Sequence, residues 1–247
     1  MLKNVLVCLD KSAASSPCQQ AATDFAKNYG AVLTGLCVEK PLRMGSVYSA
    51  GELMTGTDGP ARVDRPGVAQ LFPGGSTMWS RSHDIPRAAQ AFDLIVTDRN
   101  ELESALVREA ARPVMLVSEP GGALEKIAVA YDGSPGADRA LALAVDIALH
   151  WRAGKPEIVL LAAVGNSRES REFLRPASRY LRLYDVAFTS HIATGPAADA
   201  LVRLAEEEGA NLLCMGAFGH SLARDLFAGS TTQGVMRLWK KPLLLSP

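Results

Sequence analysis

A glycine-rich stretch near the end of the chain has the composition and spacing of an anion-binding loop. Two residues separate Gly216 from Gly219, and nine more separate Gly219 from Gly229. A phosphate needs several backbone N–H groups at close range, and glycine permits that approach because it has no Cβ. We therefore expect this stretch to bind a phosphate-bearing ligand. The hydroxyl donors that follow the last glycine are Ser230, Thr231 and Thr232.

An alternation of apolar runs and helical stretches places these glycines in a fold. The apolar run Leu212–Met215 ends at Gly216, and Ser230–Trp239 predicts a helix that begins where the loop ends. Ligands of open α/β sheets lie at the carboxyl ends of the strands, and a helix N-terminus favours an anion. Alternating strands and helices imply a parallel sheet with helices on both faces. The other expected strands of this part are Ile127–Tyr131, Ile158–Val164, Val186–Ile192 and Leu243–Leu245, and the other expected helices are Ala137–Trp151, Phe173–Tyr184 and Ala197–Glu208.

The chain repeats itself, which indicates two related halves. Val5–Ser12 aligns with Ile127–Ser134 at an offset of 122 residues, and both are apolar runs that end in Asp with Ser two residues later. The order of the later segments also agrees, so we predict two tandem α/β domains at 1–120 and 123–247. The later matching segments are Phe92–Thr97 with Ala210–Met215 and Arg112–Ser118 with Lys241–Ser246.

Residues 123–247 resemble the universal stress protein family, whose ATP-binding members carry the pattern Gly-x2-Gly-x9-Gly-Ser/Thr. Gly216, Gly219, Gly229 and Ser230 match this pattern without a gap. The resemblance implies two open-twisted, five-stranded parallel sheets of the Rossmann-like, adenine nucleotide alpha hydrolase-like type, with a degenerate N-terminal domain. The implied ligand is ATP, ADP or AMP, with or without Mg²⁺.

The same resemblance implies roles for residues outside the glycine loop. Asp132, at the end of the first strand of the second half, would contact the ribose and a nearby metal. Phe218 stands where family members often have His or Arg; His220 or Arg224 could replace that phosphate contact, or both could be surface residues. Residues expected to line the adenine pocket are Ala130, Tyr131 and Val164. The full expected nucleotide site is Ala130, Tyr131, Asp132, Val164, Met215, Gly216, Phe218, Gly219, Gly229, Ser230, Thr231 and Thr232.

The first half lacks the glycine loop. Asp98 and Pro113 are 15 positions apart, whereas Gly216 and Pro242 are 26 apart. No glycine lies between Asp98 and Pro113. Asp10 alone is explained more simply as a helix cap than as a nucleotide contact. We therefore expect no nucleotide in this half. The middle of the first half also differs from that of the second half. Pro41–Gly75 predicts a long irregular loop, and the next helix is expected to be short, at about Pro86–Ala91.

The last strands of the two halves suggest why both halves are kept. Val114–Val117 and Leu243–Leu245 are short apolar strands that would be prone to association if exposed. Universal stress proteins commonly dimerise through these strands. The resemblance therefore implies an intramolecular pseudo-dimer, and it leaves open whether the chain also forms a homodimer.

Composition narrows the range of functions. Lys plus Arg and Asp plus Glu each number 26, and this zero net charge argues against a general nucleic-acid binder. No apolar run approaches the roughly 20 residues of a membrane span. The four cysteines show no metal-binding or CxxC spacing and are interpreted as buried thiols of a reducing compartment. We expect a cytoplasmic protein with no membrane contact.

The leading functional interpretation is a nucleotide-binding stress-response or signalling module with unknown protein partners. A slow ATPase or nucleotide hydrolase is the first alternative, although no P-loop and no evident general base is present, so no catalytic residue is expected. A ligand-free scaffold is the second alternative. Gly216→Val with Gly229→Val is expected to abolish nucleotide binding and to leave the fold intact.

Overall fold

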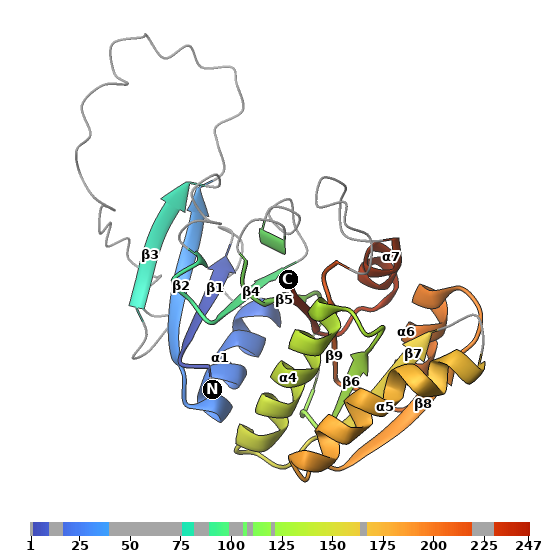
Figure 1. The fold of residues 1–247 in the computed structure, drawn as a ribbon. Helices are drawn as coiled ribbons and strands as arrows, with labels where there is room; N and C mark the ends of the chain where they lie inside the picture. The colour runs from blue at the N-terminus through green and yellow to red at the C-terminus, as the bar shows by residue number, and fades with distance from the viewer. Residues whose placement is uncertain are drawn as a thin grey trace, which may run out of the picture.

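The protein is built on one large sheet with helices on both faces (Figure 1). The computed structural model describes residues 2–9, 17–39, 76–81, 89–98, 106–107, 111–119, 122–163, 167–218 and 230–247. The strands are β1 (Asn4–Leu9), β2 (Val32–Glu39), β3 (Ser76–Arg81), β4 (Leu94–Asp98), β5 (Val114–Val117), β6 (Lys126–Ala130), β7 (Glu157–Ala163), β8 (Phe188–Ala193), β9 (Leu212–Gly216) and β10 (Leu243–Ser246). The helices are α1 (Pro17–Tyr29), α4 (Pro135–His150), α5 (Ser167–Leu183), α6 (Ala197–Glu207) and α7 (Ser230–Leu238).

The strand order shows that the two halves have the same topology. The sheet runs β3-β2-β1-β4-β5-β10-β9-β6-β7-β8, so the order of the first half recurs in the second half when read from β8 inward. Within each half all neighbouring strands are parallel. The predicted tandem fold of two five-stranded parallel sheets is therefore confirmed. The domain boundaries at 1–120 and 123–247 stay a prediction.

The halves meet through the pairing that the apolar last strands predict. β5 and β10 pair antiparallel, with Leu244 opposite Met115, and both strands are buried throughout. In separated halves, β5 and β10 would each have an exposed edge, and their pairing covers both edges. The consequence is a single ten-stranded sheet.

Two elements differ from the sequence prediction. Ser76–Arg81 was not predicted to be a strand, but it forms β3 and pairs parallel with β2. Its short, mixed composition does not indicate a strand, and its strand conformation is stabilised by the hydrogen bonds to β2. Helix α5 begins at Ser167, six residues before the predicted Phe173. The added turns are rich in Arg and Glu, which are good helix formers without an apolar period. The predicted loop Pro41–Gly75 and most of the predicted helix Pro86–Ala91 lie outside the described residues.

The helices divide between the two faces of the sheet. One core cluster joins α1, α4 and α5 to the sheet, and the other joins α6 and α7 to the opposite face. In Figure 1 the first three helices lie side by side in front of the sheet. Both clusters contain residues of the two halves, so the hydrophobic core is continuous across the β5–β10 junction.

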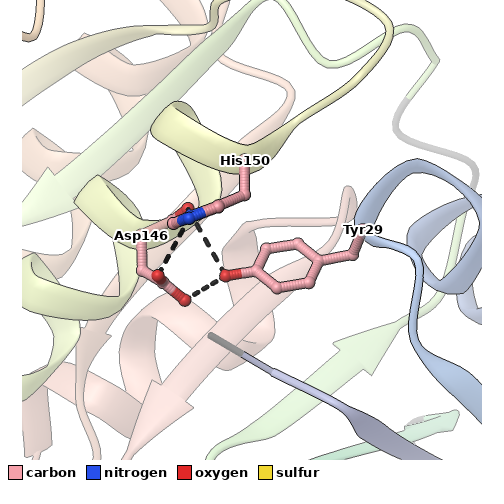
Figure 2. Close-up of polar contacts among 3 residues, drawn as sticks. All are labelled: Tyr29, Asp146 and His150. Atoms are coloured by element: carbon pink, nitrogen blue, oxygen red, sulfur yellow. Dashed lines mark hydrogen bonds and ion pairs between the residues drawn. The ribbon is translucent and has the colours of Figure 1, made fainter.

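Helices α1 and α4 also connect the halves through a polar cluster (Figure 2). The Tyr29 hydroxyl of α1 donates a hydrogen bond to Asp146 Oδ2 of α4, and His150 Nδ1 lies 3.1 Å from Asp146 Oδ1. Phe25 stacks on the Tyr29 ring and meets Trp151 edge to face, with ring centroids 5.6 and 5.5 Å apart. The two halves therefore share a side-chain interface in addition to the strand junction.

Candidate functional site

The carboxyl ends of three neighbouring strands bring the sequence-predicted residues together. β9 lies between β6 and β10, with Met215 opposite Ala130 and Gly216 opposite Ser246. Asp132 follows β6 by two residues, and Gly216 ends β9. Because these strands are parallel, Asp132 and Gly216 lie at the same edge of the sheet, where ligands of open α/β folds bind.

A tight turn fixes Asp132 in front of helix α4. The Ser134 N–H donates to Asp132 Oδ1 at 2.9 Å, and Gly133 adopts the left-handed conformation with φ of +77°. Ser134 is the N-cap of α4: its Oγ accepts a hydrogen bond from the Ala137 N–H at 3.2 Å, and Pro135 is the first helical residue. The Asp132 side chain is exposed to solvent and oriented by its own backbone turn.

Gly216 packs directly against the first turn of α4. A Cβ added at Gly216 would lie 3.0 Å from the Ala137 nitrogen and 3.0 Å from the Gly136 carbonyl carbon. A Cβ added at Gly136 would in turn lie 3.2 Å from the Gly216 Cα. Both contacts are with backbone, which cannot move aside as a flexible side chain can. The premise that Gly216 lies in a loop is wrong, because this residue ends β9. We therefore expect Gly216→Val to disturb helix–strand packing as well as the predicted site.

The first turn of α7 is attached to the same strand end. Thr232 is buried, and its hydroxyl donates to the Gly216 carbonyl at 3.4 Å. Ser230 is exposed and Thr231 is half-buried, and both line a cavity of about 480 Å³ between the start of α6 and the length of α7. The N-terminal N–H groups of α7 consequently lie near the carboxyl end of β9, where the helix dipole favours negative charge.

The residues expected beside adenine lie on different faces of the sheet. Ala130 belongs to the core cluster beneath α6 and α7, together with Met215. Tyr131 belongs to the α4 side, where its hydroxyl donates to Asp138 Oδ1 at 2.7 Å. Burial of the ring, reinforced by this hydrogen bond, raises the pKa of the Tyr131 hydroxyl. The Tyr131 side chain therefore lies on the opposite face of the sheet from Ala130. Phe218 is half-buried against the Ala130 cluster.

Three predicted site residues lie outside the described residues: Val164, Gly219 and Gly229. The same holds for His220 and Arg224, and for Asp10 of the first half. Their proposed contacts with a nucleotide stay predictions. Across the described ranges, no group of three or more His, Cys, Asp or Glu side chains could hold a metal ion.

Sequence reasoning missed two residues that shape this edge. Gly136 provides the close approach of α4 to Gly216, and Ser134 caps the same helix. The run Asp132-Gly133-Ser134-Pro135-Gly136 did contain a signal, because Ser before Pro is typical of an N-cap followed by the first helical position. The contact between Gly136 and Gly216, which are 80 positions apart in the sequence, has no such local signal.

None of the helices in the described part of the chain is long and apolar enough to cross a membrane.

Comparison with known proteins agrees with the fold. Residues 123–247 match the family model described as the universal stress protein family. Universal stress protein Slr1230 of Synechocystis sp. is 29% identical over 145 residues, which cover 56% of this chain and 48% of that protein. The match thus spans about half the length of this curated relative.

Solved structures give the same result. A universal stress protein from Archaeoglobus fulgidus has a TM-score of 0.73 at 17% identity, covering 97% of this chain and 95% of its own. A putative universal stress protein from Pseudomonas aeruginosa has a TM-score of 0.66 at 19% identity, covering 99% of this chain and 92% of its own. These likenesses concern the fold over nearly the whole chain, and the family match concerns half of it. The chain belongs to the universal stress protein family.

Proposed function

We propose that the second half of the chain binds an adenine nucleotide, ATP or one of its products ADP and AMP, and acts as a nucleotide-dependent stress-response or signalling module. The observation that carries this proposal is the hydrogen bond from Thr232 to the Gly216 carbonyl. It holds the N-terminus of α7 at the strand end that adjoins β6 and the exposed Asp132. The proposal is supported by the position of these two groups at one edge of the sheet, where the helix terminus would bind the phosphates and the carboxylate would bind the ribose.

The donor set at this edge suits a phosphate chain. Ser230 and Thr231 offer hydroxyls and backbone N–H groups. Gly219 and Gly229 have no Cβ that would hinder the approach of a phosphate. Asp132 offers carboxylate oxygens for the ribose hydroxyls or for a phosphate-bound Mg²⁺. Thr232 has a different role: its hydroxyl is engaged with Gly216, so it positions the helix.

The first half would serve as the structural partner of the second. Its β5 strand pairs with β10, and α1 packs on α4. We propose that it binds no nucleotide, because its sequence lacks the glycine loop after Asp98.

Calorimetric titration of nucleotide-stripped protein with Mg-ATP, followed by an assay of the same sample for ADP, tests the proposal. We expect one site per chain and no accumulation of ADP. Steady ADP formation would instead indicate a slow ATPase, and the absence of binding would favour the ligand-free scaffold.

A matched pair of variants locates the site. Asp132→Ala should weaken ATP binding about tenfold or more, since hydrogen bonds to a charged group contribute about 1.5–3 kcal/mol. Asp10→Ala, at the equivalent position of the first half, should leave affinity within about twofold. Circular dichroism checks that Asp132→Ala, which also removes the hydrogen bond to Ser134, remains folded. Equal losses in both variants would contradict a single site in the second half.

A further inference from the structure

The second half ends in an open strand edge. β8 is the last strand of the sheet order and pairs only with β7 among the described strands. The Ile158 N–H donates to the Ala187 carbonyl at 2.9 Å, which sets the hydrogen-bond phase of the β7–β8 ladder. In a parallel ladder of this phase, the N–H and C=O groups of Phe188, Ser190 and Ile192 point away from β7. An edge of this kind is a template for an added strand.

The β8 edge carries little of the protection that edge strands usually have. Its sequence, Phe-Thr-Ser-His-Ile-Ala, contains no Lys, no Arg and no Pro. His191 points toward α6, where its Nε2 lies 3.1 Å from Glu208 Oε1. The six residues span about 20 Å, enough to pair with an extended peptide of similar length.

A groove runs along this edge on the α5 side. It has a volume of about 1180 Å³ and is floored by Ser190 and Ile192 of β8. Leu183 stands beside it with 75% of its surface exposed, and half-buried Tyr180 lines it as well. Apolar side chains of an added strand that faced α5 would therefore find apolar partners next to the free backbone groups.

The rim of the groove is positively charged. Arg175, Arg179 and Arg182 line it from successive turns of α5 and are exposed. Among the lining residues whose side chains the structure describes, Glu172 is the only acidic one. The Arg182 guanidinium lies 5.9 Å from the centroid of the Phe188 ring. Within the described part of the chain, Arg175 and Arg179 form no ion pair. The net excess of cationic groups favours a partner with carboxylates.

We propose that the α5–β8 groove binds an extended, acidic segment of another protein, which pairs with β8 as an additional strand. Backbone pairing to Phe188, Ser190 and Ile192 would supply affinity, and the arginines of α5 would select acidic side chains on the α5-facing positions. A second copy of this chain fits less well, because pairing β8 with β8 would bring the α5 arginines of two molecules together. The described lining of this groove shares no residue with the proposed nucleotide site, and its function is independent of that site.

Binding of a designed probe tests the proposal. The probe is a fluorescent nine-residue peptide with Thr at even positions and Asp and Leu alternating at odd positions, so that one face is acidic and apolar. Fluorescence anisotropy should show saturable binding to the full chain. The same peptide with Lys in place of Asp should bind at least about tenfold more weakly. No binding of the acidic probe, or equal binding of the two peptides, would overturn the proposal.

Variants separate the charge from the backbone pairing. Arg175→Glu with Arg179→Glu should weaken the acidic probe at least about tenfold, while Lys27→Glu with Lys155→Glu, the same charge change elsewhere, should stay within about twofold. Ser190→Pro removes an outward N–H and should also weaken binding about tenfold, whereas Ser190→Ala should not. Loss with the arginine variant but not with Ser190→Pro would mean a general polyanion surface, and would refute strand addition.

Hydrogen exchange in the unaltered protein provides a readout that needs no proline variant. The amides of Phe188, Ser190 and Ile192 should exchange more slowly when the acidic probe is bound. Unchanged exchange at these amides would contradict the proposal. A single-stranded oligonucleotide that displaces the probe at lower concentration would assign the groove to nucleic acid instead. A dimer in sedimentation that Ser190→Pro dissociates would assign it to a second copy.

Discussion

Asp93 and Asn211 occupy equivalent positions in the two halves and make the same contact. The Asp93 Oδ2 atom accepts hydrogen bonds from the N–H groups of Lys3 and Asn4 at 2.7 and 3.0 Å. The Asn211 Oδ1 atom accepts them from Glu125 and Lys126 at 3.0 and 3.2 Å. Each residue thus satisfies the backbone at the start of its half's first strand and precedes the strand that pairs with it. The repeat in the sequence extends to this detail, except that one half uses a charged side chain.

The negative charge of Asp93 should stabilise the folded protein at neutral pH and lose this effect in acid. Burial raises the pKa of this carboxyl, but the hydrogen bonds from Lys3 and Asn4 and the charge of Arg112 outweigh it and leave the pKa below 3.8. A lowered folded-state pKa stabilises the protein above the unfolded-state value, and this contribution is lost as the pH falls through the folded-state value. Asp93→Asn should therefore reduce the loss of stability that accompanies a fall in pH below the ordinary Asp pKa of about 3.9.

Urea unfolding at neutral and acid pH checks this. Asp93→Asn should lower the free energy of unfolding at pH 7, because the charge is lost, but by less than Asp93→Ala, because an amide supports the same contact at Asn211. The difference from the unaltered protein should disappear in acid. Asp93→Ala, which leaves two N–H groups without their acceptor, should cost about 1 kcal/mol, a value at the low end because the site is half-exposed. An acid dependence unchanged in Asp93→Asn would show that other carboxyls dominate.

Gly216→Ala should destabilise the protein even without any ligand. The new Cβ would lie 3.0 Å from two backbone atoms of α4, so the helix or the strand must shift, at a cost of about 1–3 kcal/mol. Gly154→Ala is the matched control, because a Cβ there meets nothing within 4 Å, and it should change stability by less than about 0.5 kcal/mol. Thermal unfolding of the nucleotide-free variants is the measurement. Equal midpoints would disprove the packing role of Gly216.

The hydrogen bond between Tyr29 and Asp146 should contribute to the association of the halves. Tyr29→Phe keeps the ring stacked on Phe25 but removes the donor to Asp146 Oδ2, and should cost about 1–2 kcal/mol. A double-mutant cycle with Asp146→Asn, followed by urea unfolding, measures the coupling between the two side chains. Additive effects would mean that the contact in Figure 2 contributes no coupling energy.

The described cysteine thiols should be unreactive in the folded protein. Cys8, Cys18 and Cys214 are buried. Burial raises the pKa of all three, that of Cys8 to about 12. The thiolate is the reactive form, so a thiol reagent at pH 8 should modify these three only after denaturant is added. Mass spectrometry of native and denatured samples locates the modified residues, and rapid native labelling of Cys214 would contradict its placement at the centre of β9.

Much of the fold follows from local patterns in the sequence. The apolar runs that became β6, β7, β9 and β10 were predicted to within one or two residues, because strands buried on both faces are continuously apolar. The helix α6 was predicted to end before Gly209, which has a φ of +72°. β3 could not be predicted in this way, since its hydrogen bonds come from β2 and its own residues show no sustained period.

Part of the candidate site could also be predicted from the sequence, and part could not. The types and spacing of Gly216, Ser230 and their neighbours, with Asp132 at the end of the first strand, were enough to indicate a phosphate-binding edge. Consecutive strand residues such as Ala130 and Tyr131 point to opposite faces of the sheet. Which of the two faces α4 and which faces α6 was not evident from the sequence, because it depends on how the strand packs between these helices.

The sequence by itself therefore determined the repeat, the order of strands and helices, the apolar last strands and the glycine spacing, all of which depend on residues close together in the chain. Only the tertiary structure decided that Gly216 rests on Gly136, that Thr232 holds the Gly216 carbonyl, and that β8 is left with an open edge beside the α5 arginines. Those features depend on backbone approach and strand pairing between distant segments, and such contacts form through packing that no local pattern encodes.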